Sequence, residues 1–179
     1  MIALLVALLL LVVSGEYNIT TYVGIGNGDG LTATSAVLTS PFGVALDSSR
    51  NLYIADTYAN KVRKVDSTTN LMSTVAGSGI DDYSGDAGAA TSAAFQIPIK
   101  VALDSSNNIY IADQNNNVIR KVTVSTGIIT TVAGKASTTG TVTDGIAATS
   151  SKLYYPSDVT VGTSYLQIPR IILYTLLYS

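Results

Sequence analysis

The sequence predicts an all-β protein built from repeated four-stranded antiparallel sheets. Residues 42–56 read FGVALDSSRNLYIAD and residues 99–113 read IKVALDSSNNIYIAD, so nearly the same segment occurs twice. The 179 residues are 47% hydrophobic and only 12% charged. They are rich in Val, Ile, Thr, Tyr, Gly, Ser and Asn, a mixture that favours strands and tight turns over helices.

The two copies of the repeat keep one constant offset along the chain. The aligned positions are Pro41 and Pro98, Asp47 and Asp104, Asp56 and Asp113, Arg63 and Arg120, and the TVAG segments at 74–77 and 131–134. A constant offset over so long a span indicates a repeat architecture. We therefore expect two full units, at about residues 41–97 and 98–155.

Each unit contains four short apolar runs separated by turn-forming residues. In the first unit we expect strands at Gly43–Leu46, Leu52–Ala55, Lys61–Val65 and Leu71–Ala76. The linkers DSSRN, DTYAN and DSTTN carry Asp, Asn and Ser, which form turns through side-chain hydrogen bonds or left-handed backbone. Short strands joined in this way form an antiparallel meander, and four strands per repeat is the blade of a β-propeller.

The first and third strands of the unit are expected to differ in environment. Residues 44–46 are apolar without alternation, which predicts an inner strand covered on both faces. Residues 61–65 mix charged with apolar side chains, which suits a position nearer the rim.

Partial units flank the two full ones. Residues 19–24 are similar to the end of a unit at 129–134 and are expected to form an outer strand, and residues 156–161 restart the unit. The Asp, the turn and the YIAD segment that should follow Val161 are missing, so residues 162–179 are interpreted as a truncated tail or as a divergent end that caps the stack. The open sheet edges of an incomplete ring predict self-association.

The N-terminus has the pattern of a secretory signal. An apolar run at 2–13 is followed by Ser14 and Gly15. It is shorter than the ~20 residues that span a bilayer, which favours a signal peptide at residues 1–15 over a membrane span; a buried strand or helix at the domain edge is the alternative. Asn18 begins the glycosylation sequon Asn-Ile-Thr. These features predict a secreted, extracellular protein with no membrane span after cleavage.

The composition argues against several classes of function. The chain has neither His nor Cys, so the commonest general base and the thiolate metal sites are absent. Its net charge of −2 gives no electrostatic footprint for nucleic acid. The oxygen-rich segments 27–30 and 81–86 lack the spacing of a calcium loop and are better explained as turns. We expect no catalytic residue, no metal site and no cofactor.

The repeated pattern P-x-x-V-A-L-D-S-S-x-N-[LI]-Y-I-A-D…N-x-[VI]-R-K-V…T-V-A-G resembles the NHL repeat. Residues 85–93, GDAGAATSA, resemble the long-loop variety of that repeat, and residues 144–150 are a looser copy. Tyr58 departs from the pattern, because the family usually has Gly or Asn in that turn. The resemblance covers residues 19–161 and implies a ring of about six blades. Six units of this length would need ~340 residues.

This fold implies where a binding surface lies. In such propellers the turns between the second and third strands share one face with the loops after the fourth strand, and loops on a rigid scaffold commonly carry function. The candidate binding residues on that face are Asp56, Tyr58, Asn60, Asp82, Tyr83, Asp86, Asp113, Asn115 and Asn117.

Two functional hypotheses follow. The first is a non-catalytic extracellular module that presents these loops to a protein, peptide or glycan partner. The alternative is a propeller-type enzyme, lyase-like or lactonase-like, which the absence of His disfavours. The Asp and Arg residues that recur in every unit are expected to be structural, because Asp at a turn accepts backbone N–H bonds.

Overall fold

The computed structural model describes residues 28–136 and 145–162, together with the strand residues 166–167. The first sheet has the strand order β1-β2-β3-β4, with β1 at Val44–Leu46, β2 at Leu52–Asp56, β3 at Lys61–Val65 and β4 at Met72–Ala76. The second sheet has the order β5-β6-β7-β8, with β5 at Pro98–Leu103, β6 at Ile109–Asp113, β7 at Val118–Thr123 and β8 at Ile128–Ala133. Every neighbouring pair is antiparallel.

The remaining elements are short. Strand β9 (Thr160–Val161) pairs antiparallel with β10 (Leu166–Gln167). Three 3-10 turns are described, η2 (Ala33–Ser35), η3 (Thr57–Ala59) and η4 (Ala90–Ser92). Within the described ranges no helix is long and apolar enough to cross a membrane.

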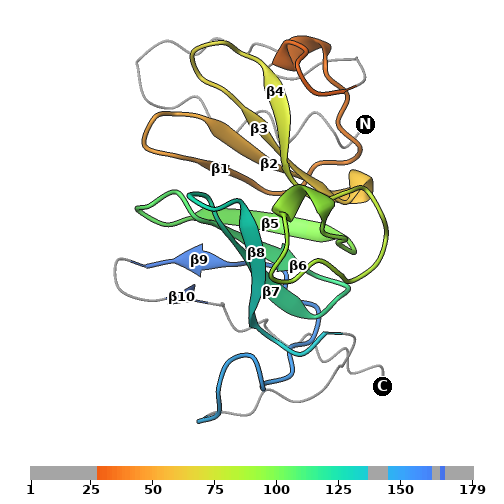
Figure 1. Ribbon diagram of the computed structural model, residues 1–179, viewed down its shortest axis with the longest axis vertical. Helices are drawn as coiled ribbons and strands as arrows, with labels where there is room; N and C mark the ends of the chain where they lie inside the picture. The colour runs from red at the N-terminus through yellow and green to blue at the C-terminus, as the bar shows by residue number, and fades with distance from the viewer. Residues whose placement is uncertain (1–27, 137–144, 163–165, 168–179) are drawn as a thin grey trace, which may run out of the picture.

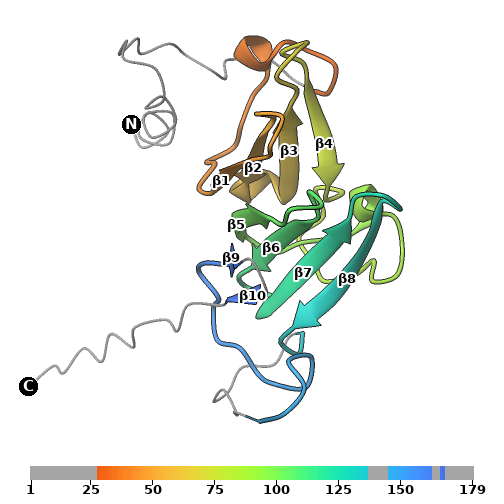
Figure 2. The ribbon, with the colours of Figure 1, turned by 90° about the vertical axis from the view of Figure 1, so that its left-hand side faces the viewer.

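The four-stranded repeat unit is confirmed. The four strands of the first sheet match the predicted ranges to within one residue at each end. The two sheets, hereafter blade 1 (β1–β4) and blade 2 (β5–β8), stack face to face, and β9 packs next to β5 as the start of a third sheet (Figures 1 and 2). The predicted signal peptide, the Asn18 sequon, the predicted outer strand at 19–24 and most of the tail lie outside the described residues.

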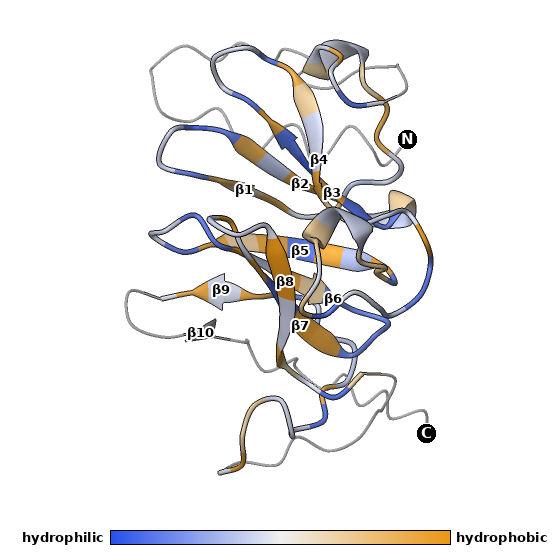
Figure 3. Cartoon of the chain, in the orientation of Figure 1, coloured by the Kyte–Doolittle hydropathy of each residue, from blue (hydrophilic) through white to orange (hydrophobic). Residues whose placement is uncertain are grey.

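The core lies between the blades. Apolar residues fill the strands while polar residues mark the turns (Figure 3). The cluster between the two sheets includes Val62 and Ala76 of blade 1, Ile111 and Ile129 of blade 2, and Phe95 of the connecting loop, all at most 2% exposed. The blades approach closely at Gly43, where an added Cβ would lie 2.6 Å from the backbone oxygen of Ile99.

The prediction that the first strand is covered on both faces holds for β5, where Val101 and Ala102 pack into clusters on opposite faces, and is wrong for β1. Val44 and Ala45 are half-buried and Leu46 is 45% exposed, whereas all five residues of β2 are buried. Strand β1 is the edge strand of its sheet, with one hydrogen-bonded neighbour. Strand β2 is central and has an apolar cluster on each face, which is why it is the better-covered strand.

The opposite edge of each blade is covered by the loop that precedes the blade. The backbone N–H of Met72 in β4 donates to Leu31 O at 2.9 Å, and Met72 O accepts from Gly30. In blade 2, Ile129 makes the same two bonds to the segment at 87–88. Each blade therefore leaves only its first strand with an unpaired edge within the described sheets.

The turn between the first two strands has the expected chemistry. Asp47 Oδ1 accepts hydrogen bonds from the N–H groups of Ser49 and Asn51, each at 2.9 Å. Asp104 does the same in blade 2. These carboxylates are turn-formers, as their repetition indicates.

The glycine that ends each TVAG segment has a strict conformational requirement. Gly77 has φ +93, and a Cβ there would lie 2.3 Å from the backbone oxygen of Asn60. Gly134 has φ +87 and meets Asn117 O at the same distance. Both positions therefore exclude any side chain, by backbone angle and by contact.

We predict that Gly77→Ala or Gly134→Ala lowers the free energy of unfolding by about 3–5 kcal/mol, because each adds left-handed strain and a backbone clash. The control is Gly127→Ala, where φ is +69 and nothing lies within 4 Å, so only about 1–2 kcal/mol of strain is expected. Urea denaturation of the three variants measures the difference. Equal losses at positions 77 and 127 would contradict the close approach.

Candidate functional site

The loops expected to form a binding face do gather at one end of the blades. The β2–β3 and β6–β7 turns and the connection from β4 to β5 lie along the right-hand edge in Figure 1. Asn116 Nδ2 donates to Asp82 O at 3.0 Å, which ties the β6–β7 turn to that connection. We call this end of the molecule the loop face.

The predicted site residues divide into two groups. Tyr58 is 61% exposed and Asp82 is exposed, while the side chain of Asp86 is 39% exposed. Tyr83 and Asn115 are half-buried. The other four predicted residues are buried: Asp56, Asn60, Asp113 and Asn117.

The buried asparagines are inter-blade anchors. Asn60 Oδ1 accepts the N–H of Ile97 at 3.1 Å, and Asn117 Oδ1 accepts the N–H of Tyr155 at 2.9 Å. Ile97 and Tyr155 each precede a proline and have positive φ, 56 and 46. Each asparagine thus fixes the strained residue that begins the next unit, and its oxygen is directed into the protein instead of toward a ligand.

The buried aspartates accept hydrogen bonds from backbone N–H groups that are distant in the sequence. Asp113 Oδ1 accepts the N–H of Gln96 at 2.8 Å, and Asp56 Oδ1 accepts the N–H of Thr39. The partner lies 17 residues earlier in each case, so these carboxylates are long-range anchors and not local turn-formers. Asp56 and Asp113, predicted for the binding face, are at most 1% exposed and serve as anchors inside the fold.

A buried arginine neutralises each buried aspartate. In blade 1, Arg63 lies between Asp29 at 2.8 Å and Asp56 at 3.6 Å. In blade 2, Arg120 is fully buried and lies 2.8 Å from Asp86 and 3.7 Å from Asp113. An unpaired charge at such a depth would be strongly destabilising. Each arginine is therefore paired with two carboxylates, the buried aspartate and a second one from the preceding loop.

Asp29 and Asp86 are separated by the same offset as the other repeated pairs, such as Arg63 and Arg120. Sequence reasoning treated the segments that hold them as oxygen-rich turns and missed their pairing with arginine, although the common offset was visible. Among the described residues there is no group of three or more acidic side chains arranged to hold a metal ion.

Burial changes the ionisation of these carboxyl groups. It raises the pKa of Asp113 to about 7, despite hydrogen bonds from Asn116 and Gln96 and the Arg120 charge. Burial also raises the pKa of Asp56, and there the Thr39 N–H and Arg63 oppose it. For Asp29 the effect of burial is outweighed by hydrogen bonds from Thr74 and by Arg63, so its pKa is lowered.

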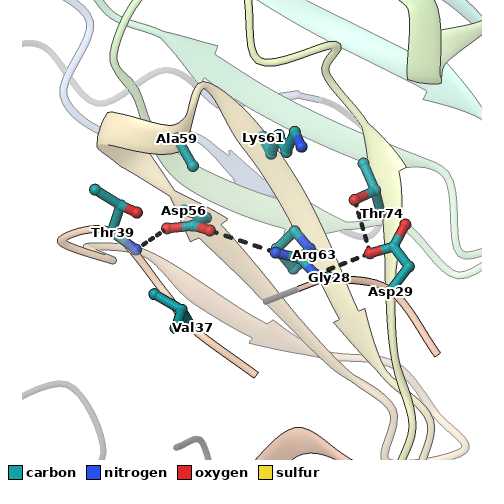
Figure 4. Close-up of a pocket in the computed structure, with 9 residues that line it drawn as sticks. All are labelled: Gly28, Asp29, Val37, Thr39, Asp56, Ala59, Lys61, Arg63 and Thr74. Atoms are coloured by element: carbon teal, nitrogen blue, oxygen red, sulfur yellow. Dashed lines mark hydrogen bonds and ion pairs between the residues drawn. The ribbon is translucent and has the colours of Figure 1, made fainter. Parts of the chain in front are cut away.

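A polar cleft of about 290 Å³ opens beside Arg63 in blade 1 (Figure 4). The cleft brings two carboxylates, a guanidinium, an ammonium and two threonines together with small apolar side chains. Its lining residues are Gly28, Asp29, Val37, Thr39, Asp56, Ala59, Lys61, Arg63 and Thr74. Such a lining can hydrogen-bond a ligand hydroxyl and stack a planar group on the guanidinium.

Sequence relatives support the repeat assignment. No family model matches the chain. NHL repeat-containing protein 2 from Homo sapiens is 32% identical over 119 residues, which is 65% of this chain and 16% of that protein. Protein SUPPRESSOR OF QUENCHING 1, chloroplastic, from Arabidopsis thaliana is 29% identical over 102 residues, 57% of this chain and 9% of that protein. The chain thus spans less than a fifth of the length of these relatives.

Solved structures share the fold. A protein of unknown function from Bacteroides thetaiotaomicron matches with a TM-score of 0.64 at 19% identity, over 82% of this chain and 34% of that one. An auxiliary nutrient binding protein from the same bacterium matches with a TM-score of 0.55 at 24% identity, over 66% of this chain and 32% of that one. The resemblance to NHL-repeat proteins and the β-propeller fold class are confirmed.

We predict that Asp113 makes stability fall as pH rises. Its pKa of about 7 in the folded state exceeds the ordinary 3.8, so the folded state binds more protons between those values. The free energy of unfolding of the wild type, relative to Asp113→Asn, should therefore decrease from about pH 4 to about pH 7.

The control for this titration is Asp104→Asn. Burial acts to raise the pKa of Asp104, but hydrogen bonds from Asn108 and Ser106 outweigh it and lower the pKa. Relative to this variant, the stability of the wild type should rise with pH and be lost in acid. Urea denaturation across pH 3 to 8 measures both, and slopes of the same sign would refute the burial argument.

Proposed function

We propose that this NHL-type β-propeller module is a non-catalytic, extracellular binding unit whose loop face contacts a protein, peptide or glycan partner. One observation carries the proposal: the loop face has exposed apolar and aromatic side chains next to turns that are fixed by buried Asp and Asn residues. Tyr58 and Ile80 are each 61% exposed at the loop face of blade 1. Tyr154 and Tyr155, next to the anchor Asn117, are 60% and 43% exposed.

The two exposed residues of blade 1 both adjoin the β2–β3 turn. The N–H of Tyr58 donates to Thr39 O at 3.0 Å. Gly79, which precedes Ile80, lies against Ala59, because its Cβ would be 3.6 Å from Ala59 O. Tyr58 and Ile80 therefore flank the same turn. Aromatic and apolar side chains on a rigid support are typical of protein interfaces, since little side-chain entropy is lost on binding.

The extracellular location rests on the apolar run at 2–13, and the absence of catalysis rests on the composition. With no His in the chain, a general base would have to be a carboxylate, a lysine or a tyrosine. In the described part of the chain, the carboxylates of the cleft, Asp29 and Asp56, are already paired with Arg63. Lyase or lactonase activity is the competing proposal, and turnover of either substrate class would replace ours.

The loop face can be tested on glycan and peptide arrays. We predict that the double variant Tyr58→Ser, Ile80→Ser weakens binding of any array ligand at least tenfold, because it removes the apolar contacts. The matched control is Val124→Ser, which is 45% exposed in the β7–β8 turn at the opposite end and should bind as the wild type does. Equal effects of the two changes would contradict the assignment of the face.

We also predict that the isolated chain self-associates through the unpaired edge of a first strand. Leu46→Lys, at the edge strand β1, should shift the mass measured by light scattering toward the monomer, because a charge opposes edge-to-edge pairing. Val124→Lys has the same exposure of 45% and lies away from that edge, so it should leave the mass unchanged. A monodisperse wild-type monomer across concentrations would rule this out.

A further inference from the structure

A position that Tyr83 fills in blade 2 is filled by no described residue in blade 1. In blade 2 the ring of Tyr83 lies over Arg120, with 4.8 Å between the ring centroid and Cζ. The hydroxyl of Tyr83 lies 2.9 Å from Thr131 Oγ1 and donates to Asp86 Oδ2 at 3.1 Å. The chain thus contains one occupied phenol site, built by an arginine, a threonine and an aspartate.

Blade 1 has all three of these partners. Arg63, Thr74 and Asp29 are the counterparts, one repeat earlier, of Arg120, Thr131 and Asp86. Asp29 Oδ1 is 2.8 Å from Arg63 Nη2, as Asp86 Oδ1 is from Arg120 Nη2. Thr74 Oγ1 donates directly to Asp29 Oδ1 at 3.0 Å, whereas in blade 2 the Tyr83 hydroxyl lies between the threonine and the aspartate. All three line the cleft of about 290 Å³, where Figure 4 shows them directed toward one another.

The sequence has no tyrosine at this position in the first unit. In the second unit, Tyr83 belongs to the segment SGIDDYS between Gly77 and Gly85. The corresponding glycines of the first unit, Gly24 and Gly28, are separated only by Ile-Gly-Asn. The segment is shorter and contains no aromatic side chain, so it supplies no counterpart of the Tyr83 ring.

Packing of a preceding blade does not bury this position. Blade 2 has blade 1 packed before it, yet the Asp86 side chain is 39% exposed and Tyr83 is only half-buried. In blade 1 the Asp29 side chain is 51% exposed. The position therefore faces solvent at the loop face in both blades, and in blade 1 a partner can reach it.

We propose that the cleft beside Arg63 binds a tyrosine side chain supplied by a partner peptide or protein. The ring stacks on the guanidinium, and the hydroxyl donates to Asp29 and meets Thr74, as Tyr83 does in blade 2. A phenylalanine would leave these two polar groups without the ligand hydroxyl and binds less well. This inference deepens the binding role proposed above and rests on it for the source of the ring.

The test is a titration of the full chain, followed by NMR, with p-cresol, N-acetyltyrosine amide and N-acetylphenylalanine amide. The tyrosine amide and p-cresol should saturate one site with a Kd on the order of 1 mM, as small ligands of this size do. The shift changes should centre on Arg63 and Thr74, and the phenylalanine amide should bind at least fivefold more weakly. No saturation by p-cresol, or equal binding of the two amides, would overturn the proposal.

A pair of matched variants locates the site. Thr74→Val removes the hydroxyl beside the cleft and should reduce the preference for tyrosine over phenylalanine at least threefold. Thr131→Val makes the same change in blade 2, where Tyr83 already occupies the position, and should leave the preference unchanged. Equal effects of the two variants would place the bound ring elsewhere.

A third variant creates a second site. Tyr83→Ala vacates the position in blade 2, so p-cresol should bind with a stoichiometry of two and raise the lowered melting temperature of the variant. A stoichiometry that stays at one, with no recovery of the melting temperature, would count against the chemistry of both positions.

The two proposals can fail separately. If p-cresol does not bind while array ligands still depend on Tyr58 and Ile80, the tyrosine site is wrong and the binding module stands. If p-cresol binds beside Arg63 while no array ligand is found, the tyrosine site stands and the broader loop face does not.

Discussion

The buried carboxylate at the end of each blade's second strand is the constraint on which the rest of the architecture depends. Asp113 is fully buried, and an isolated charge there would be very costly. It is satisfied by the N–H of Gln96, by Asn116 and by Arg120. The first of these bonds fixes the segment between the blades, and the arginine in turn requires Asp86 from the preceding loop. One carboxylate therefore determines both how its own blade begins and where the preceding loop lies.

This dependence explains why the buried anchor residues are the same in both units while other positions differ. The anchors recur once in every unit because each interface between units needs them. Two positions near the carboxylate differ between the blades. Tyr83 has no counterpart in the shorter first loop, and Ala59 stands in blade 1 where Asn116 stands in blade 2. Ala59 lines the cleft of blade 1, so the site arises where the repeat is imperfect.

The strands could be predicted from the sequence because their signals are local. Runs of five residues that include strand-forming Val, Ile or Tyr, set between Asp- and Asn-rich turns, place β2 and β3 without knowledge of the fold. Long-range partners could not be predicted in this way. Arg63 pairs with Asp29 from 34 residues away, and Asp56 with a backbone N–H from 17 residues away. Asp and Asn in a turn are usually exposed, which is why Asp56 and Asn60 were expected at the surface when they are buried anchors.

The comparison of the two blades also indicates what a partner must supply. Tyr83 is attached to the chain, so its ring is present at a high effective concentration and needs little intrinsic affinity to occupy its position. A tyrosine from a partner lacks that advantage and would bind weakly through the Arg63 cleft alone. Tyr58 and Ile80 lie next to the cleft, since Ala59 both lines it and neighbours Tyr58. A partner that places its tyrosine beside Arg63 while covering these two exposed side chains would gain the apolar contacts that the ring by itself does not provide.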